Sequence, residues 1–292
     1  MNNNAMDRLP FVSSVLHPTD FSAASDRAFA YALAIALIRQ TEFTILHVNP
    51  DKHSEADWAR FPRVREILER WGLLEIGSPR SAVFEKFRTR VEKVAINSGS
   101  PSHATIQYLD THPADLIVMA TEGRSDLSRA IDRSVAESIA GWSGTMTLFV
   151  PGKADRGLVS LEDGNLSLRN ILIPIDQQPN PAAALEFARR AAETIGEEAV
   201  RITLLHVGDS PINIPNLQDG ANWSWHSEHR QGEVVANICD VAEKVAADLL
   251  VITTAGYDGV GDVIGGNTTE QVLRLSHCPV LAVPSKYTNI KY

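Results

Sequence analysis

The chain has 292 residues, of which 44% are hydrophobic and 22% charged, so its composition is that of a folded globular protein rather than a disordered or fibrous one. This length predicts about two domains. Lys and Arg number 27 against 36 Asp and Glu, and the net charge of -9 provides no positive field to hold nucleic acid or an anionic membrane. The residues up to Asp155 carry -2 and the remainder -7. We therefore expect neither nucleic acid nor a membrane as the main partner.

The cysteines and the first residues indicate the compartment. Cys239 and Cys278 both lie in apolar contexts of the second half, which fits core residues in a reducing environment better than a disulfide framework. The opening stretch MNNNAMDRLPF lacks the basic segment and apolar core of a signal peptide, and no apolar run approaches the ~20 residues that cross a bilayer. The sequence predicts a cytoplasmic protein.

The first half alternates short apolar runs with helical segments. The apolar runs are SSVL, FTILHV, DLIVMAT and TMTLFV, and a further strand is expected near RVEKVAI. Between the first two runs, SAASDRAFAYALAIALI predicts a long helix whose first residue, Ser22, is a preferred cap. Farther on, Val64, Ile67, Leu68 and Trp71 recur at helical spacing and predict another helix.

The second half shows the same alternation after the polar, glycine-containing stretch DRGLVSLEDGNLSLR, which we interpret as a linker. Its apolar runs are NILIPI, ITLLHV, DLLVITT and PVLAV, and a weaker strand is expected around WSWHSEH. The segment EVVANICDVAEKVAA carries apolar residues at helical spacing and predicts a helix. Runs that are apolar on both faces and separated by helices predict a parallel sheet covered on both sides.

The same blocks occur twice in the same order. SSVLHPTDFSAASDRAFAYALAIAL matches RNILIPIDQQPNPAAALEFARRAAE, FTILHVNP matches ITLLHVGD, ADLIVMATEG matches ADLLVITTAG, and GTMTLFVPGK matches HCPVLAVPSK. Four matches in one order indicate a tandem duplication. We expect one domain over residues 1–155 and a second over 165–292, each a doubly wound, mostly parallel, five-stranded α/β sheet.

The two copies differ in length. The first has 26 more residues between Val48 and Gly123 than the second has between Val207 and Gly256, and the extra segment falls near 51–81. We interpret it as a helix that covers its own domain, and a lid or partner-binding element is the alternative.

Ligands of an open parallel sheet bind beyond the carboxyl ends of its strands. Asp20 and Asp176 follow the first apolar run of their copies, Val48 and Val207 end the second run, and a glycine-bearing turn later leads into a helix. A carboxylate accepts a hydrogen bond from an adenine amino group or a ribose hydroxyl, and backbone amides at a glycine turn and a helix start hold phosphates. This combination predicts a nucleotide. For each Asp, capping the next helix or closing a turn is the alternative.

The blocks ATEGRSDLSRAIDRSVAESIA and TTAGYDGVGDVIGGNTTEQVLR each precede a final strand. Together with PTDFS, LHV and ADLIV, they resemble the universal stress protein family, whose nucleotide-binding members carry Gly, two residues, Gly, nine residues, and then Gly with Ser or Thr. The resemblance covers nearly the whole chain and implies a tandem two-domain member with an adenine nucleotide alpha hydrolase-like, Rossmann-like fold. It further implies ATP as the ligand, a role under stress, and pairing of TMTLFV with PVLAV as an intramolecular pseudo-dimer, with a homodimer left open.

The glycine pattern is incomplete in both copies. In the first copy Arg133 adds bulk where a backbone must approach phosphate, or else its guanidinium binds the phosphate. The second copy keeps Gly256 and Gly266, so it is the better nucleotide candidate. The candidate ligand-binding residues of the second copy are Pro174, Asp176, Val207, Thr253, Gly256, Gly266, Asn267 and Thr268. Those of the first copy are Asp20, Val48, Gly123, Arg133 and Ser134.

Other constellations are weaker. His226 and His229 could be metal ligands, but the set is incomplete and we predict no metal site. His47 and His206 recur in the LHV blocks and are interpreted as structural. The chain has no G-x-S-x-G, G-x-x-x-x-G-K-[ST] or H-E-x-x-H motif, so no catalytic residues are predicted and any ATP hydrolysis is expected to be weak.

The sequence is compatible with three functions. The first is a stress-response protein that binds an adenine nucleotide in at least one half and uses its occupancy to bias shape or partners. The second is a nucleotide-free interaction module of the same fold, favoured by Arg133 and Thr253 at glycine positions. The third is a weak ATP hydrolase.

Overall fold

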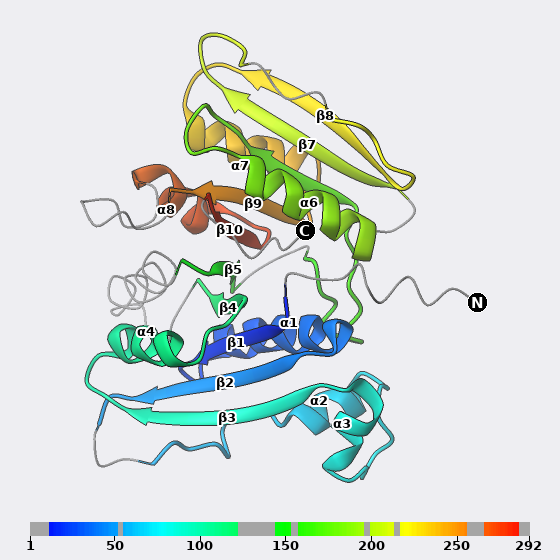
Figure 1. Ribbon diagram of the computed structural model, residues 1–292, viewed down its shortest axis with the longest axis vertical. Helices are drawn as coiled ribbons and strands as arrows, with labels where there is room; N and C mark the ends of the chain where they lie inside the picture. The colour runs from blue at the N-terminus through cyan, green and yellow to red at the C-terminus, as the bar shows by residue number, and fades with distance from the viewer. Residues whose placement is uncertain are drawn as a thin grey trace.

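A computed structural model of the chain describes residues 12–51, 55–121, 144–152, 157–195, 199–212, 217–255 and 266–285, with only the backbone at 266–267. Within these ranges the strands form one continuous ten-stranded sheet in the order β3-β2-β1-β4-β5-β10-β9-β6-β7-β8 (Figure 1). The first five strands in the chain make one half of the sheet, and the last five make the other.

Each half is a parallel sheet with the same strand order. The first half contains β1 (Ser14–Thr19), β2 (Glu42–Asn49), β3 (Arg90–Asn97), β4 (Leu116–Ala120) and β5 (Met146–Val150). The second contains β6 (Asn170–Pro174), β7 (Val200–Val207), β8 (Trp223–Arg230), β9 (Leu249–Thr254) and β10 (Val280–Pro284). The predicted doubly wound α/β class with tandem five-stranded halves is confirmed, including β3 and the more weakly predicted β8.

The two halves meet where β5 pairs with β10. This pairing is antiparallel, with Leu148 opposite Leu281 and Thr147 opposite Ala282, and all four residues are buried. The expected contact between the final strands is therefore present, and it merges the two predicted sheets into one. The join covers two apolar edges that would otherwise be exposed.

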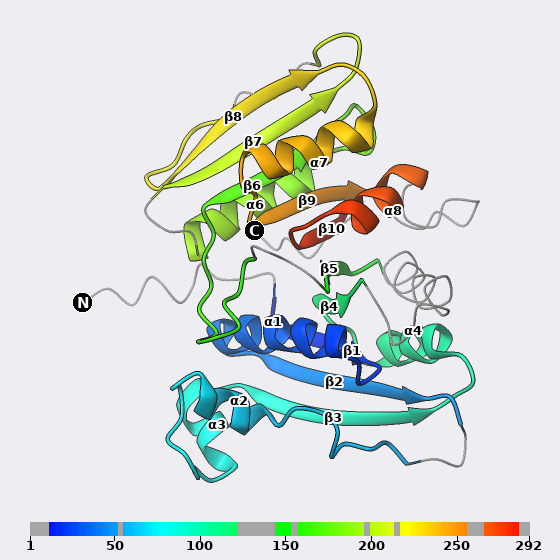
Figure 2. The same ribbon diagram turned by 180° about the vertical axis from the view of Figure 1, so that it is seen from behind.

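Helices cover both faces of the sheet (Figures 1 and 2). One face packs against α1 (Ala23–Arg39) and α6 (Ala182–Ile195), in a core that includes Phe29 and Leu185. The other face packs against α4 (Pro101–Thr111), α7 (Val234–Lys244) and α8 (Gly266–Leu275). Successive strand residues alternate between the two cores, as in β1, where Val15 and Leu16 belong to opposite faces.

Two of the long helices begin after a residue whose side chain caps the helix N-terminus. Ser22 accepts a hydrogen bond from the Ser25 amide at 3.1 Å and starts α1, as predicted. Glu233 caps α7 by accepting from the amides of Val235 and Ala236.

The extra segment of the first half packs beside β3 (Figure 1). It contains α2 (Val64–Arg70) and is followed by α3 (Ser81–Phe87), and Ile67, Leu68 and Trp71 are buried in the same core as α1. The predicted helix is therefore present and covers its own half. Helix α3 was not predicted, although its residues Ala82, Val83 and Phe87 pack against the same core while remaining partly exposed.

The stretch interpreted as a linker is more ordered than its polar composition suggests. Val159 forms an antiparallel bridge to Leu166, and Leu158 and Leu168 are buried in the core. Trp71 donates its indole N–H to the Leu161 carbonyl at 3.0 Å, which ties this turn to the extra segment. The exact domain boundaries stay predictions. Within the described ranges, no helix combines the length and the apolar character that crossing a membrane requires.

Candidate functional site

Each half of the sheet has a point where neighbouring strands diverge. The pairing of β1 with β4 runs through Val15–Leu116 and Leu16–Ile117, although β1 continues to Thr19. The pairing of β6 with β9 likewise runs through Ile171–Leu249 and Leu172–Leu250. The helices that follow β1 and β6 (α1 and α6) and the helices that precede β4 and β9 (α4 and α7) cover opposite faces of the sheet, so β1/β4 and β6/β9 are the switch points at which ligands of such sheets bind.

A histidine at the end of the neighbouring strand fixes the backbone beside each switch point. His47 on β2 lies with Nδ1 2.8 Å from the Thr19 carbonyl oxygen, and His206 on β7 lies with Nδ1 3.2 Å from that of Ile175. Both imidazoles are buried. The carbonyl bound in each case belongs to the residue directly before the candidate Asp. The repeated histidines thus hold the two strand ends in place, which agrees with the structural role expected for them.

Asp20 closes a turn in the first half. Its Oδ1 accepts a hydrogen bond from the Ser22 amide at 2.9 Å, and Ser22 in turn caps α1. Asp20 is half-buried. The pKa of the nearby Asp26 is raised, first by the burial of Asp26 and then by the negative charge of Asp20. Asp20 therefore has the turn-closing role that was the alternative to ligand binding.

An aromatic cluster covers the strand ends of the first half. It consists of Phe21, His47, Trp58 and Phe61. Phe21 stacks on His47 with ring centroids 3.9 Å apart, and Trp58 meets Phe21 edge-on at 5.4 Å. Phe21 has a φ of 60°, a left-handed conformation that an aromatic residue rarely adopts. Because Trp58 and Phe61 come from the extra segment, only the first half can form this cover.

The corresponding place in the second half is open among the described residues. Asp176 is exposed, and the hydrogen bond recorded for its carboxylate comes from the adjacent Gln177 amide at 2.7 Å. Asn180, not Asp176, accepts from the Ala182 amide at the start of α6. Gln177, also exposed, stands where the first half has Phe21. The Asp176 carboxylate is therefore available to a ligand.

Thr253 brings a polar atom to the same switch point. It is 8% exposed, lies near the carboxyl end of β9, and its Oγ1 has no hydrogen-bond partner among the described residues. A buried hydroxyl without a partner costs free energy, and a ligand atom can satisfy it. Thr268 is exposed in the first turn of α8. Because α8 joins the parallel strands β9 and β10, its N-terminus lies at the carboxyl ends of these strands.

The other candidate residues divide into two groups. Pro174 and Val207 end β6 and β7, Val48 lies at the end of β2, and all three are half-buried at the expected edge. Gly266 and Asn267 begin α8. Gly123, Arg133, Ser134 and Gly256 lie outside the described residues.

A buried polar chain beneath the first switch point was not anticipated. His17 on β1 is fully buried, and its Nδ1 lies 2.8 Å from the Val118 carbonyl oxygen on β4. Its Nε2 lies 3.3 Å from Ser25 Oγ, which also bonds to Thr19 Oγ1 at 2.7 Å. Burial lowers the pKa of His17 to about 4, against the opposing effects of the Val118 carbonyl and the Asp20 charge. Ile173 occupies the matching position of the second half.

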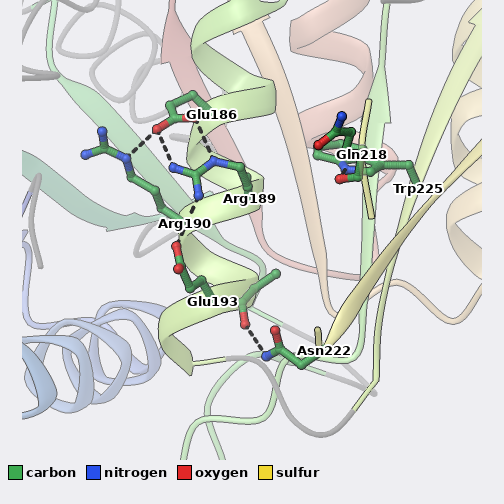
Figure 3. A network of polar contacts seen from close by, with 8 residues as sticks. Glu186, Arg189, Arg190, Glu193, Gln218, Asn222 and Trp225 are labelled. Atoms are coloured by element: carbon green, nitrogen blue, oxygen red, sulfur yellow. Dashed lines mark hydrogen bonds and ion pairs between the residues drawn. The ribbon is translucent and has the colours of Figure 1, made fainter. Parts of the chain in front are cut away.

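Charged side chains pair with one another along α6 (Figure 3). Glu186 binds Arg189 at 2.8 Å and Arg190 at 2.5 Å, and Arg189 also reaches Glu193 at 3.1 Å. The hydrogen bonds and charges of the arginines lower the pKa of Glu186. Asn222 donates to the Ala192 carbonyl at 3.0 Å and ties the approach to β8 to the same helix. We assign this network a structural role and none of its groups a catalytic one.

The described residues contain no group of three or more His, Cys, Asp or Glu that could hold a metal ion. His226 Nε2 contacts Ser224 Oγ at 3.0 Å, and His229 Nε2 lies 2.8 Å from the Gly208 carbonyl oxygen. Cys239 and Cys278 are free thiols whose pKa is raised by burial; Cys278 is buried, as predicted for a core residue, whereas Cys239 is half-buried.

A duplicated, doubly wound α/β sheet with a switch point in each half defines a tandem protein of the Rossmann-like class. A family model described as "Universal stress protein family" matches residues 12–151 and 216–284, which is most of the chain. The chain belongs to the universal stress protein family, and the predicted family resemblance is confirmed.

Individual relatives agree with this assignment. Universal stress protein Sll1654 of Synechocystis sp. is 24% identical over 148 residues, which cover 44% of this chain and 94% of that protein. Universal stress protein MJ0531 of Methanocaldococcus jannaschii is 40% identical over 58 residues, covering 20% of this chain and 34% of that protein. The crystal structure of a universal stress protein from Archaeoglobus fulgidus aligns with a TM-score of 0.63 at 20% identity, covering 94% of this chain and 97% of that one. The last comparison supports the tandem fold.

Proposed function

We propose that the second half of the chain binds an adenine nucleotide, with ATP as the expected ligand, beyond the carboxyl ends of β6, β7 and β9. The observation that carries the proposal is the contrast between the two switch points. In the second half Asp176 is exposed and does not cap the following helix, whereas in the first half Asp20 closes a turn beside the ring of Phe21, which stacks on His47.

Each group at the second switch point has a matching part of a nucleotide. The Asp176 carboxylate can accept a hydrogen bond from the adenine amino group or a ribose hydroxyl. The buried hydroxyl of Thr253 can donate to or accept from the ligand and so gain its missing partner. The α8 N-terminus, starting at Gly266, offers backbone amides and the positive end of the helix dipole to the phosphates.

The first half is proposed to be the nucleotide-poor one. The aromatic cluster fills space next to the ends of β1 and β2, and a base could enter only if Phe21 or Trp58 moved. This favours an interaction role for the first half, the second of the functions considered above. In the whole protein, occupancy of the second half would bias shape or partner choice as part of a stress response in the cytoplasm.

Isothermal titration of the full chain with ATP and with adenosine tests the proposal. Asp176→Ala should weaken both ligands by about tenfold to a hundredfold, because it removes one charge-assisted hydrogen bond of roughly 1.5–3 kcal/mol. The matched variant Asp20→Ala should leave both affinities unchanged. Gly266→Arg should alter ATP binding more than adenosine binding, since it acts at the phosphate end.

Two results would reject the proposal. If Asp176→Ala and Gly266→Arg both bind ATP and adenosine like the parent, the candidate residues are structural and the nucleotide-free interaction module is correct. If Asp20→Ala weakens ATP binding more than Asp176→Ala, the first half is the binding half. Steady-state phosphate release, measured on the parent chain, separates ATP binding from hydrolysis.

A further inference from the structure

The loop that follows β7 is held by side chains through three successive carbonyl groups. It comprises residues 208–210, and we call it the β7 loop. His229 Nε2 lies 2.8 Å from its first carbonyl oxygen, Gln231 Nε2 donates to the second at 3.2 Å, and His206 Nε2 lies 3.1 Å from the third. These side chains come from the paired strands β7 and β8 and from the residue after β8, at the edge of the sheet (Figure 1). The loop begins directly after Val207, beside the proposed ligand site.

His206 faces a carbonyl oxygen with each of its ring nitrogens. Nδ1 lies 3.2 Å from the oxygen of Ile175, and Nε2 lies 3.1 Å from that of Ser210. A neutral imidazole carries a single N–H, so it can donate to one of these oxygens while its other nitrogen turns a lone pair toward the second. The imidazolium donates to both oxygens. The two carbonyl groups therefore form a complete pair of acceptors only for the protonated ring.

The first half shows which of the two contacts depends on the additional proton. His47 makes the same Nδ1 contact, at 2.8 Å from the Thr19 carbonyl oxygen. Ala95 lies opposite His47 in the strand register. In the second half, His229 takes this position opposite His206. The Nδ1 contact is common to both copies, so we assign the N–H of the neutral ring to Nδ1 and the additional proton to Nε2.

Glycine at position 208 fits the β7 loop to the imidazole. A Cβ atom at Gly208 would lie 2.8 Å from His206 Nε2, which is closer than a side-chain carbon approaches unless the ring moves. The first copy has Asn49 at the matching position. The β7 loop can therefore pass this close to the ring because residue 208 has no side chain.

His206 is the member of a stacked histidine pair that has acceptors for the additional proton. Its ring stacks on that of His229 with centroids 5.6 Å apart and an interplanar angle of 10°. Protonation of both rings would place two like charges at this distance, which disfavours the doubly charged pair. Both nitrogens of His206 have a recorded carbonyl contact, whereas among the described residues His229 has one through Nε2. The first turn of α6 adds no charged residue. The other charged residues on the elements around the ring are Asp176 after β6, Asp209 of the β7 loop, and the mutually paired Glu228 and Arg230 of β8.

We propose that protonation of His206 latches the β7 loop and thereby raises the affinity of the second half for an adenine nucleotide. Histidine takes up a proton within roughly pH 5 to 8. In the acidic part of this range the ring donates to both carbonyl groups and fixes the loop at Ser210. In the alkaline part Nε2 carries a lone pair and releases that end of the loop.

The latched loop suits ligand binding for two reasons. Asp176 is exposed while the loop is held, so the latched loop leaves the proposed ligand group accessible. A loop that is already fixed also loses less conformational entropy when a ligand binds. The gain in affinity rests on the function proposed above, whereas the latch itself does not.

Histidine NMR of the ligand-free, full-length chain tests the latch. In a sample with ¹⁵N-labelled histidine, both ring nitrogens of His206 should carry a proton at pH 5.5, and only Nδ1 should carry one at pH 8. In a uniformly ¹⁵N-labelled sample, relaxation measurements should show less motion of the Ser210 amide at pH 5.5 than at pH 8. The same protonation state of His206 at both pH values, or equal motion of the Ser210 amide, would overturn the proposal.

Titration with adenosine tests the link to binding, because adenosine is uncharged at both pH values. The parent should bind adenosine roughly twofold to tenfold more tightly at pH 5.5 than at pH 8, the factor by which the ordering of a few groups weakens binding. His206→Gln can still donate to one carbonyl group but does not titrate, so it should show no such difference. The matched control His226→Gln removes an exposed histidine of β8 whose Nε2 contacts Ser224 Oγ, and it should keep the difference seen in the parent.

The titration can contradict the link in two ways. Equal adenosine affinity of the parent at both pH values, or a His206→Gln chain that keeps the difference seen in the parent, would reject the coupling between the latch and the site. Absence of adenosine binding at both pH values would reject the proposed function and with it the gain in affinity, while the NMR measurement decides the latch separately.

Discussion

Mild acid should destabilise this protein through His17. The imidazole is fully buried in the first half, with the Val118 carbonyl and the Ser25 hydroxyl as its polar neighbours. Burial disfavours the imidazolium, so the folded chain keeps His17 neutral at a pH where the unfolded chain protonates it. Because the folded pKa is below the unfolded one, the stabilisation is complete above the unfolded value and is lost as the pH falls toward the folded value.

The magnitude follows from the two pKa values. With 6.5 in the unfolded chain and about 4 in the folded one, the loss begins near pH 6.5 and is complete near pH 4. The full difference corresponds to about 3 kcal/mol, and about 2 kcal/mol should be gone at pH 5. This is a large part of the stability of a typical domain, which is roughly 5–15 kcal/mol.

Urea unfolding at pH 7 and pH 5, followed by circular dichroism, measures the effect. The variant His17→Gln has no titrating group at this position, so its stability should fall by about 2 kcal/mol less than that of the parent over the same interval. Carboxylates elsewhere contribute equally to both proteins and cancel in the comparison. An identical loss in parent and variant would refute the assignment of the acid sensitivity to His17.

Two further predictions concern the packing of the molecule. Trp71→Phe should lower the free energy of unfolding by about 1–2 kcal/mol, because it removes the indole hydrogen bond to the Leu161 carbonyl; thermal unfolding measures this, and an unchanged midpoint would contradict it. Leu281→Asp should lower the free energy of unfolding by more than about 3 kcal/mol, because it buries a charge where β10 pairs with β5. The control Leu275→Asp, at an exposed position, should not have this effect. Urea titration measures both, and a Leu281→Asp chain as stable as the parent would contradict the prediction.

Much of the fold could be predicted because the chain repeats itself. The two copies give the same strand runs, the same Asp after the first strand and the same histidine at the end of the second. In the structure, His47 and His206 bind equivalent carbonyl groups, so the repeated letters correspond to a repeated contact. The helix that begins at Ser22 was also predictable, because its cap is local in sequence.

The unpredicted features depend on contacts without a counterpart in the second copy. Phe21 meets Trp58 across many residues of chain, and the extra segment that carries Trp58 occurs once, so neither spacing nor repetition relates the two residues. His17 occupies an ordinary strand position, and its burial against Val118 and Ser25 emerges only from the packing of α1 on β1 and β4. The role of Asp20 was left open for a different reason: a turn and a ligand would both use a carboxylate at this point, and the bond from the Ser22 amide in the structure corresponds to the turn.

The antiparallel pairing of β5 with β10 determines which way each half faces. All strands of one half run parallel, so a single antiparallel contact reverses the direction of the entire second set. The sheet also twists strongly from one edge to the other, so the carboxyl ends of β2 and β3 and those of β7 and β8 point to the same side of the molecule (Figures 1 and 2). The antiparallel contact and the twist together therefore turn the strand ends of both halves toward one side, so that molecules bound beyond them would share one face of the protein.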